Sequence, residues 1–193
     1  MVVKLLTQDS IIISYRFYGA RHSILQLGYL IDFELEQDKA NFLPRLRSIS
    51  HIGFPWLYER QKLFLWHQYI SVFSQHFHDV GDIDGFYFQT LLNIAKKWHK
   101  QSPYRLIVES FVDILKFEGR LHNIQRCIVC SKNITEDNIS LIKGFLPTHT
   151  YCANSITLPK KEINDLFNSS SSLLLNDDMV KSLSSIVFKG MSN

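Results

Sequence analysis

Cysteine is scarce in this sequence and long hydrophobic runs are absent, and each shortage excludes a class of protein. Three cysteines among 193 residues leave one without a partner, so a disulfide framework is a poor fit. No apolar run approaches the roughly 18 residues of a membrane span. The N-terminus also lacks a basic segment followed by an apolar core and a cleavage site. We therefore expect a protein of the reducing cytoplasm with no membrane partner.

Neither sign of charge dominates the chain. The formal net charge is +3 and the pI is near 8.7, a balance that permits an anionic partner without requiring one. With 46% hydrophobic and 13% aromatic residues, the chain can bury a substantial core. There is no Ser/His/Asp order, phosphate-cradling glycine loop or isolated carboxylate pair. We therefore predict no catalytic activity and no small-molecule substrate.

All three cysteines fall in one segment, RCIVCSKNITEDNISLIKGFLPTHTYCAN (126–154). Two residues separate Cys127 from Cys130, and His149 and Cys152 repeat that spacing after a gap of 18 residues. Paired motifs about 15–20 residues apart are typical of zinc sites. Zinc prefers four thiolate or imidazole ligands in a tetrahedron. We therefore predict a structural zinc ion bound by Cys127, Cys130, His149 and Cys152.

Other interpretations of these cysteines fit less well. Free buried thiols beside an unrelated histidine are the main alternative. A redox pair is disfavoured because this Cys-x-x-Cys does not follow a strand and open a helix. Four protein ligands would also close the zinc shell against water, and no His-x-Glu of the zinc deaminases is present, so hydrolysis and deamination are disfavoured.

The first 54 residues have the alternating pattern of β-strands. In IIISYRFY (11–18) we expect Ile11, Ile13, Tyr15 and Phe17 on one face and Arg16 and Tyr18 on the outer face. Further strands are predicted in VVKLL (2–6), YLIDFELE (29–36) and LRSISHI (46–52). Four strands in about 50 residues indicate a small barrel or sandwich.

From Pro55 the hydrophobic period becomes helical. We predict helices from Trp56 to about His78, around 88–98, from Ser102-Pro103 to Gly119, from Pro159 to Phe167, and from Asp177 to Phe188. The predicted fold class is therefore α+β. A β domain at 1–54 precedes a helical domain at 55–193, which carries a zinc-binding insertion at about 121–155.

Several strings occur in a fixed order along the chain: YRFYGARHS, IDFE, FLPRLR, KFEGRL, the cysteine pair, and the last motif preceded by KGF. Together they resemble the RecO recombination mediators, particularly the short epsilonproteobacterial type. The resemblance runs over nearly the whole chain. It implies an N-terminal OB-fold-like β-barrel and a helical domain with a zinc insertion. It also implies binding of single- and double-stranded DNA, annealing of complementary strands, and loading of the recombinase with RecR and single-strand-binding protein, in the nucleoid-associated cytoplasm.

Several residues fit DNA binding by their chemistry. Cations pair with phosphates and an interleaved aromatic ring offers a stacking surface. The candidates, placed on one outer face and the turn beside it, are Arg16, Tyr18, Arg21, His22, Arg45 and Arg47. Residues 1–54 carry six Lys/Arg against five Asp/Glu, so only clustering makes a basic patch. The alternative is that these are solvated strand positions.

An OB barrel has five strands, and only four are predicted before Pro55. Either the true start lies upstream of Met1, or the barrel is open with one exposed edge strand. Met1 falls where the second strand begins in the family that the chain resembles.

Two further groups leave alternatives open. Lys96, Lys97 and Lys100 fit a solvated helix end or a second DNA-contacting patch. His76, His78 and Asp79 are expected to be surface residues and not a metal cluster, because helical positions two apart point to different faces. Beside the DNA-binding mediator, a zinc-bearing protein-interaction scaffold is the main alternative function, and a metal-dependent enzyme is the third.

Overall fold

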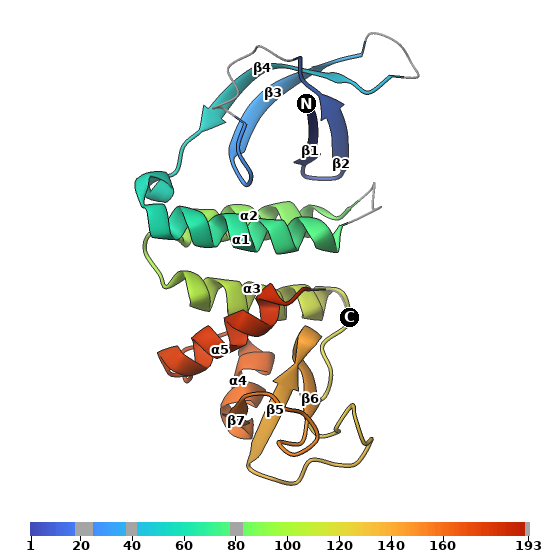
Figure 1. Ribbon diagram of the computed structural model, residues 1–193, viewed down its shortest axis with the longest axis vertical. Coiled ribbons are helices and arrows are strands. Elements are labelled where there is room, and N and C mark those ends of the chain that lie inside the picture. Colours follow the sequence, from blue (N-terminus) through green and yellow to red (C-terminus); the bar gives the residue numbers. More distant parts are fainter. Residues whose placement is uncertain (18–24, 38–41, 78–82, 192–193) are drawn as a thin grey trace. The chain divides into compact units, whose positions relative to one another are not determined.

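The computed structural model describes residues 1–17, 25–37, 42–77 and 83–191 (Figure 1). The chain forms two compact units. The first contains Met1–Ser71 and Phe77–His99, and the second contains Val72–His76 and Lys100–Asn193. No helix in the described part of the chain is both long enough and apolar enough to cross a membrane.

A four-stranded sheet forms the N-terminal part of the first unit. Its strands are β1 (Val2–Leu6), β2 (Ile11–Tyr15), β3 (Leu30–Glu36) and β4 (Arg45–Ile52), in the order β1-β2-β4-β3. The pairs β1/β2 and β3/β4 are antiparallel, whereas β2 runs parallel to β4. The structure thus confirms the four predicted strands in an α+β fold. In the part of the chain that the structure describes, these four strands form an open sheet in that order.

The predicted orientation of β2 is wrong. Ser14 is fully buried, whereas Ile13 is 49% exposed and Phe17 is 58% exposed. Arg16 continues the extended pairing through two backbone hydrogen bonds with Met1, so it lies on the same face as Ser14. The prediction followed the face with more apolar residues, but alternation alone does not show which face of a strand is covered. The small Ser14 fits the packed side.

Two helices follow the sheet, α1 (Arg60–His76), whose residues up to Ser71 belong to the first unit, and α2 (Gly85–Lys97). The structure corrects the predicted start of the first helix, because Trp56 lies in a separate 3₁₀ turn, Pro55–Tyr58, followed by an extended Glu59. The sheet is attached to α1 through Trp66, whose indole nitrogen donates to the Gly28 carbonyl oxygen at 2.9 Å. Gly28 has φ +75, and a Cβ there would lie 2.5 Å from Trp66 Nε1, so this approach requires glycine.

The core between α1 and α2 is built from all three tryptophans of the chain. Their ring centroids lie 5.0 to 6.0 Å apart, and Trp56 and Trp98 are fully buried. Each of these two indoles also finds an acceptor. Trp56 donates to the Ala95 carbonyl oxygen at 2.7 Å and Trp98 to that of Lys62 at 3.1 Å. The cluster therefore fixes the N-terminal end of α1 against the C-terminal end of α2.

The second unit contains α3 (Pro103–Phe117), α4 (Lys160–Ser169) and α5 (Asp177–Phe188). Buried residues of α3, including Ile107, Val108 and Phe111, form its core, and α3 packs against α5 (Figure 1). A small antiparallel sheet lies between α3 and α4 in the sequence. Its strands are β5 (Asn138–Ile142), β6 (Leu146–Thr148) and β7 (Thr157–Pro159), in the order β6-β5-β7. The sequence did not predict this sheet.

Candidate functional site

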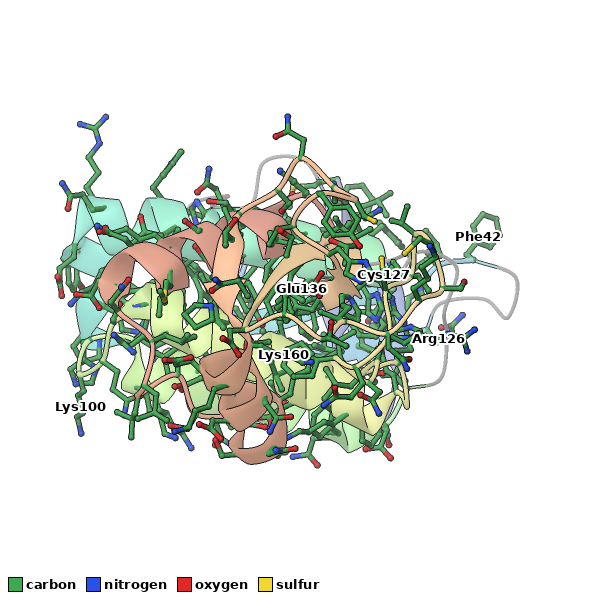
Figure 2. The ribbon with its side chains drawn as sticks, turned by 90° about the horizontal axis from the view of Figure 1, so that it is seen from below. Phe42, Lys100, Arg126, Cys127, Glu136 and Lys160 are labelled. Atoms are coloured by element: carbon green, nitrogen blue, oxygen red, sulfur yellow. The ribbon has the colours of Figure 1, made fainter. Side chains whose placement is uncertain are left out.

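The first cysteine pair lies on a tight loop that the backbone closes on itself. The Cys127 N–H donates to the Lys132 carbonyl oxygen, and the Ser131 N–H donates to the Cys127 carbonyl oxygen, both at 2.9 Å. Ser131 has φ 60, in the left-handed region, which turns the chain sharply after Cys130. Arg126 and Cys127 lie next to one another on this loop (Figure 2). The loop therefore presents both thiols from nearby backbone positions.

The second pair is delivered by the β5–β6 hairpin. His149 directly follows β6, and the Cys152 N–H donates to the His149 carbonyl oxygen at 3.0 Å. The two loops are joined because the Ile128 N–H donates to the Pro147 carbonyl oxygen at 2.9 Å. Residues that are distant in the sequence thus converge through backbone pairing.

The four predicted ligands come together as a candidate metal centre. The ligand atoms of Cys127, Cys130, His149 and Cys152 all lie within 4.8 Å of one another. Nδ1 of His149 is 3.4 Å from the Cys130 sulfur and 3.6 Å from the Cys152 sulfur. Zn–S and Zn–N bonds of about 2.3 and 2.1 Å at tetrahedral angles place sulfur and nitrogen about 3.6 Å apart. The cluster can therefore hold a metal ion of this size.

The other nitrogen of His149 has its own partners. The His149 side chain is 2% exposed. Its Nε2 lies 3.1 Å from the Asn133 carbonyl oxygen and 3.9 Å from a Glu136 carboxylate oxygen. An Nε2–H group donates to the Asn133 carbonyl oxygen, with the Glu136 carboxylate nearby but beyond hydrogen-bond distance, and this leaves the Nδ1 lone pair directed at the thiols. Such outer partners fix the tautomer that a ligating histidine needs.

The contrasting pKa values of two of these thiols also fit a cation site. Burial by itself raises the pKa of Cys127, but the backbone N–H groups of Cys130, His149 and Val129 outweigh it and lower the pKa to about 6. Burial and the neighbouring thiols of Cys130 and Cys127 raise the pKa of Cys152 to about 11. Several thiolates so close together repel one another, and a divalent cation removes that repulsion.

The sheet carries a second group of candidate residues. Tyr15 pairs with Arg45 in the register of β2 and β4, so both lie on the face opposite Ser14 and Arg16. The Arg45 guanidinium lies over the Phe17 ring, 4.6 Å from its centroid. Arg47 shares this face and forms an ion pair with Glu36 at 2.5 Å, while Arg45 lies 4.0 Å from the same carboxylate.

The structure therefore divides the predicted DNA-binding residues. Arg45 and Arg47 lie together, but Arg16 lies on the other face, with a buried Nη1 that has no hydrogen-bond partner among the described residues. The prediction of one shared outer face is wrong for Arg16. Tyr18, Arg21 and His22 fall outside the described residues, and their roles stay predictions.

The predicted surface position of His76 is also wrong. Its side chain is 11% exposed and its Nε2 lies 2.5 Å from a carboxylate oxygen of Glu118, which also pairs with Arg120 at 2.7 Å. This histidine therefore belongs to a largely buried polar network. Its predicted neighbours His78 and Asp79 lie outside the described residues.

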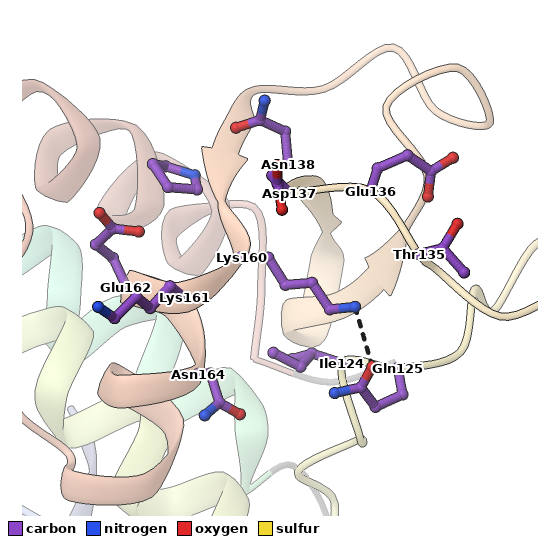
Figure 3. Close-up of a pocket in the computed structure, with 11 residues that line it drawn as sticks. Ile124, Gln125, Thr135, Glu136, Asp137, Asn138, Lys160, Lys161, Glu162 and Asn164 are labelled. Atoms are coloured by element: carbon purple, nitrogen blue, oxygen red, sulfur yellow. Dashed lines mark hydrogen bonds between the residues drawn. The ribbon is translucent and has the colours of Figure 1, made fainter.

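A shallow pocket of about 560 Å³ lies beside the metal centre, between its supporting loops and the start of α4 (Figure 3). Lys160 extends into it, and its ammonium donates to the Gln125 side-chain oxygen at 3.0 Å and to the Ile134 carbonyl oxygen. Both acceptors belong to the stem of the first cysteine loop. We interpret Lys160 as a structural tie between that stem and α4.

Residues 1–57 match the family described as RecO N terminal. The matched region contains β1 to β4 and ends in the 3₁₀ turn that carries Trp56. This part of the chain is therefore similar to the N-terminal domain of RecO proteins. No curated protein matches the chain. The resemblance to the short epsilonproteobacterial type stays a prediction.

Proposed function

We propose that this protein is a recombination mediator that acts by binding DNA and not by catalysis. The observation that carries the proposal is the match of residues 1–57 to the RecO N-terminal family. The activities proposed with it are binding of single- and double-stranded DNA, annealing of complementary strands, and recombinase loading together with RecR and single-strand-binding protein. We propose further that the sheet belongs to an OB-type barrel.

The proposed DNA surface is the sheet face that carries Tyr15, Phe17, Arg45 and Arg47. Exposed rings allow bases to stack, and guanidinium groups pair with phosphates. Phe17 is 58% exposed, and the Arg45 guanidinium lies over its ring. A stacking surface and a cation are therefore next to each other on this face. Glu36 offsets part of the positive charge, and phosphate must compete with it for both arginines.

The proposed metal is a structural zinc ion held by Cys127, Cys130, His149 and Cys152. Its role would be to join the first cysteine loop to the β5–β6 hairpin. Four protein ligands leave no position for water, which supports a role in stability and not in hydrolysis.

Fluorescence anisotropy with a labelled oligothymidine tests the DNA proposal. Affinity should fall with salt, with a log-log slope of about −0.7 per phosphate contact. Arg45→Gln combined with Arg47→Gln should therefore reduce the slope by about 1.4 and weaken binding. The control Lys181→Gln with Lys189→Gln removes the same charge from exposed positions in and just after α5, and it should leave the slope unchanged.

Arg16→Gln separates two versions of the surface. If all the predicted residues acted on one face, its effect would match that of Arg45→Gln. The observed orientation predicts a smaller effect on the slope. A wild-type protein that is folded and zinc-loaded but binds no oligonucleotide would contradict the proposal and favour the protein-interaction scaffold.

A further inference from the structure

The two helices of the first unit carry charge of one sign. Together α1 and α2 contain four lysines and arginines and no aspartate or glutamate, although the whole chain has 21 basic and 18 acidic residues. The four cations are Arg60, Lys62, Lys96 and Lys97. Two lie in the first turn of α1 and two in the last turn of α2.

Packing of the tryptophan cluster brings these two pairs together. Trp98, directly after Lys97, donates its indole N–H to the carbonyl oxygen of Lys62 at 3.1 Å. Trp56, four residues before Arg60, donates to the Ala95 carbonyl oxygen next to Lys96. The antiparallel helices in Figure 1 place the start of α1 beside the end of α2. The four cations therefore gather at one end of the helix pair, on a rigid base.

The position of Arg60 and Lys62 has an energetic cost. Helix N-termini carry partial positive charge and favour acidic side chains, yet the first turn of α1 contains no acidic residue. Lys62 forms an ion pair with Glu59 at 2.9 Å. Arg60, Lys96 and Lys97 are exposed and have no ion-pair or hydrogen-bond partner among the residues that the structure describes. Departures from a local preference are common at functional sites, and the three cations without a partner are available to a ligand.

An exposed aromatic ring accompanies the cations. Phe64 is 64% exposed and lies one turn after Arg60, on the same face of α1. Unpaired cations beside an exposed ring fit a nucleic-acid strand better than an acidic peptide, because the ring can stack on a base.

We propose that the paired helix ends, formed by Arg60, Lys62, Lys96 and Lys97 with Phe64, are a second nucleic-acid-binding surface that contacts phosphates independently of the sheet face. Two separate surfaces would allow one chain to contact two strands or two parts of one strand. The inference goes beyond the proposed sheet site and does not depend on the residues of that site.

Salt-dependent binding of labelled oligothymidine to the full chain tests this surface. Lys96→Gln with Lys97→Gln should reduce the log-log slope by about 1.4, both in the wild type and in the Arg45→Gln, Arg47→Gln background. Phe64→Ala should weaken binding about fivefold or more. The matched control is again Lys181→Gln with Lys189→Gln. Tryptophan emission and zinc content verify that each variant is folded.

Three outcomes would overturn the inference. One is an unchanged slope in the Lys96, Lys97 variant. Another is a loss no larger than that of the Lys181, Lys189 control, which would reflect net charge alone. The third is displacement of the oligonucleotide by polyglutamate as effectively as by unlabelled DNA, which would indicate a surface for acidic peptides. Failure of the sheet site alone would appear only in the Arg45, Arg47 variant, so the two proposals fail separately.

Discussion

His149 Nε2 lies 3.1 Å from the carbonyl oxygen of Asn133, a residue of the stem that follows the first cysteine pair. This contact orients the ring so that Nδ1 lies 3.4 Å from the Cys130 sulfur. His149 thus joins the two halves of the candidate metal centre. Its ring contacts the first cysteine loop, and its backbone continues from β6 of the hairpin.

Loss of one ligand should release the metal and destabilise the second unit together. Cys127 is 1% exposed, so Cys127→Ser removes a central ligand, and structural zinc contributes about 10 kcal/mol in peptide models. Metal analysis should find about one zinc per wild-type chain and much less in the variant. Val129→Ser, at an exposed position of the same loop, should retain zinc. A metal-free wild type purified without chelator would exclude the zinc site.

Chelation should loosen the metal-binding segment and leave the first unit folded. Between the two cysteines of the first loop, Ile128 and Val129 are exposed, so we expect the order of this loop to depend on the metal and on its pairing with the β5–β6 hairpin. Hydrogen exchange should accelerate there after chelator is added. The tryptophan emission reports only the first unit and should not shift. Equal loss of protection in both units would contradict the separate stability of these parts.

Trp56→Phe should destabilise the first unit by about 1–3 kcal/mol. Phenylalanine keeps much of the apolar volume but cannot donate to the Ala95 carbonyl oxygen, which accepts from Trp56 at 2.7 Å in a buried position. Urea unfolding measures the change. Tyr58→Phe, at a site that is 95% exposed, should stay within about 0.5 kcal/mol of the wild type. Equal stability of the two variants would show that the buried hydrogen bond contributes nothing.

Ser172→Ala should destabilise the loop between α4 and α5. Ser172 is fully buried, and both its N–H and its hydroxyl donate to Oε1 of Glu109, at 2.9 and 2.7 Å. Removing the hydroxyl leaves the half-buried carboxylate with one donor fewer, at a cost of about 1–3 kcal/mol. Unfolding in urea should show this loss for Ser172→Ala and almost none for Ser171→Ala. A larger loss of stability for Ser171→Ala than for Ser172→Ala would contradict the stabilising contact between Ser172 and Glu109.

His67 should make the stability of the first unit depend on pH. Its Nε2 is buried without a hydrogen-bond partner among the described residues, and burial lowers its pKa. The unfolded chain, with a pKa of about 6.5, then binds protons more readily. The free energy of unfolding is therefore highest above about pH 6.5, where His67 is neutral in both states. It decreases as the pH falls toward the lowered pKa of His67 in the folded state.

His67→Leu removes this titration. The loss of stability between about pH 7.5 and pH 5.5 should be smaller in His67→Leu than in the wild type, as measured by urea midpoints followed by tryptophan emission. His99→Leu, at an exposed position, should behave as the wild type. An equal pH dependence in all three proteins would show that His67 stays accessible to protons.

Local patterns in the sequence predicted most elements of the fold. The strand at 2–6 and the helix at 177–188 agree with β1 and α5, because alternation and helical period are properties of adjacent residues. The first helix was placed too early because Trp56 has the right spacing for the apolar stripe. Its side chain instead packs from a separate turn onto Trp66 and Trp98, and spacing does not record that packing.

The sequence alone identified the four candidate metal ligands, since their identity and spacing are local facts about Cys127, Cys130, His149 and Cys152. Only the tertiary structure decided the rest of the centre, including the Asn133 and Glu136 partners of His149, which depend on how the β5–β6 hairpin meets the first loop. The same holds for Arg16. Alternation shows which residues of a strand share a face, but which face is covered depends on strand register and tertiary packing, which adjacent residues do not record.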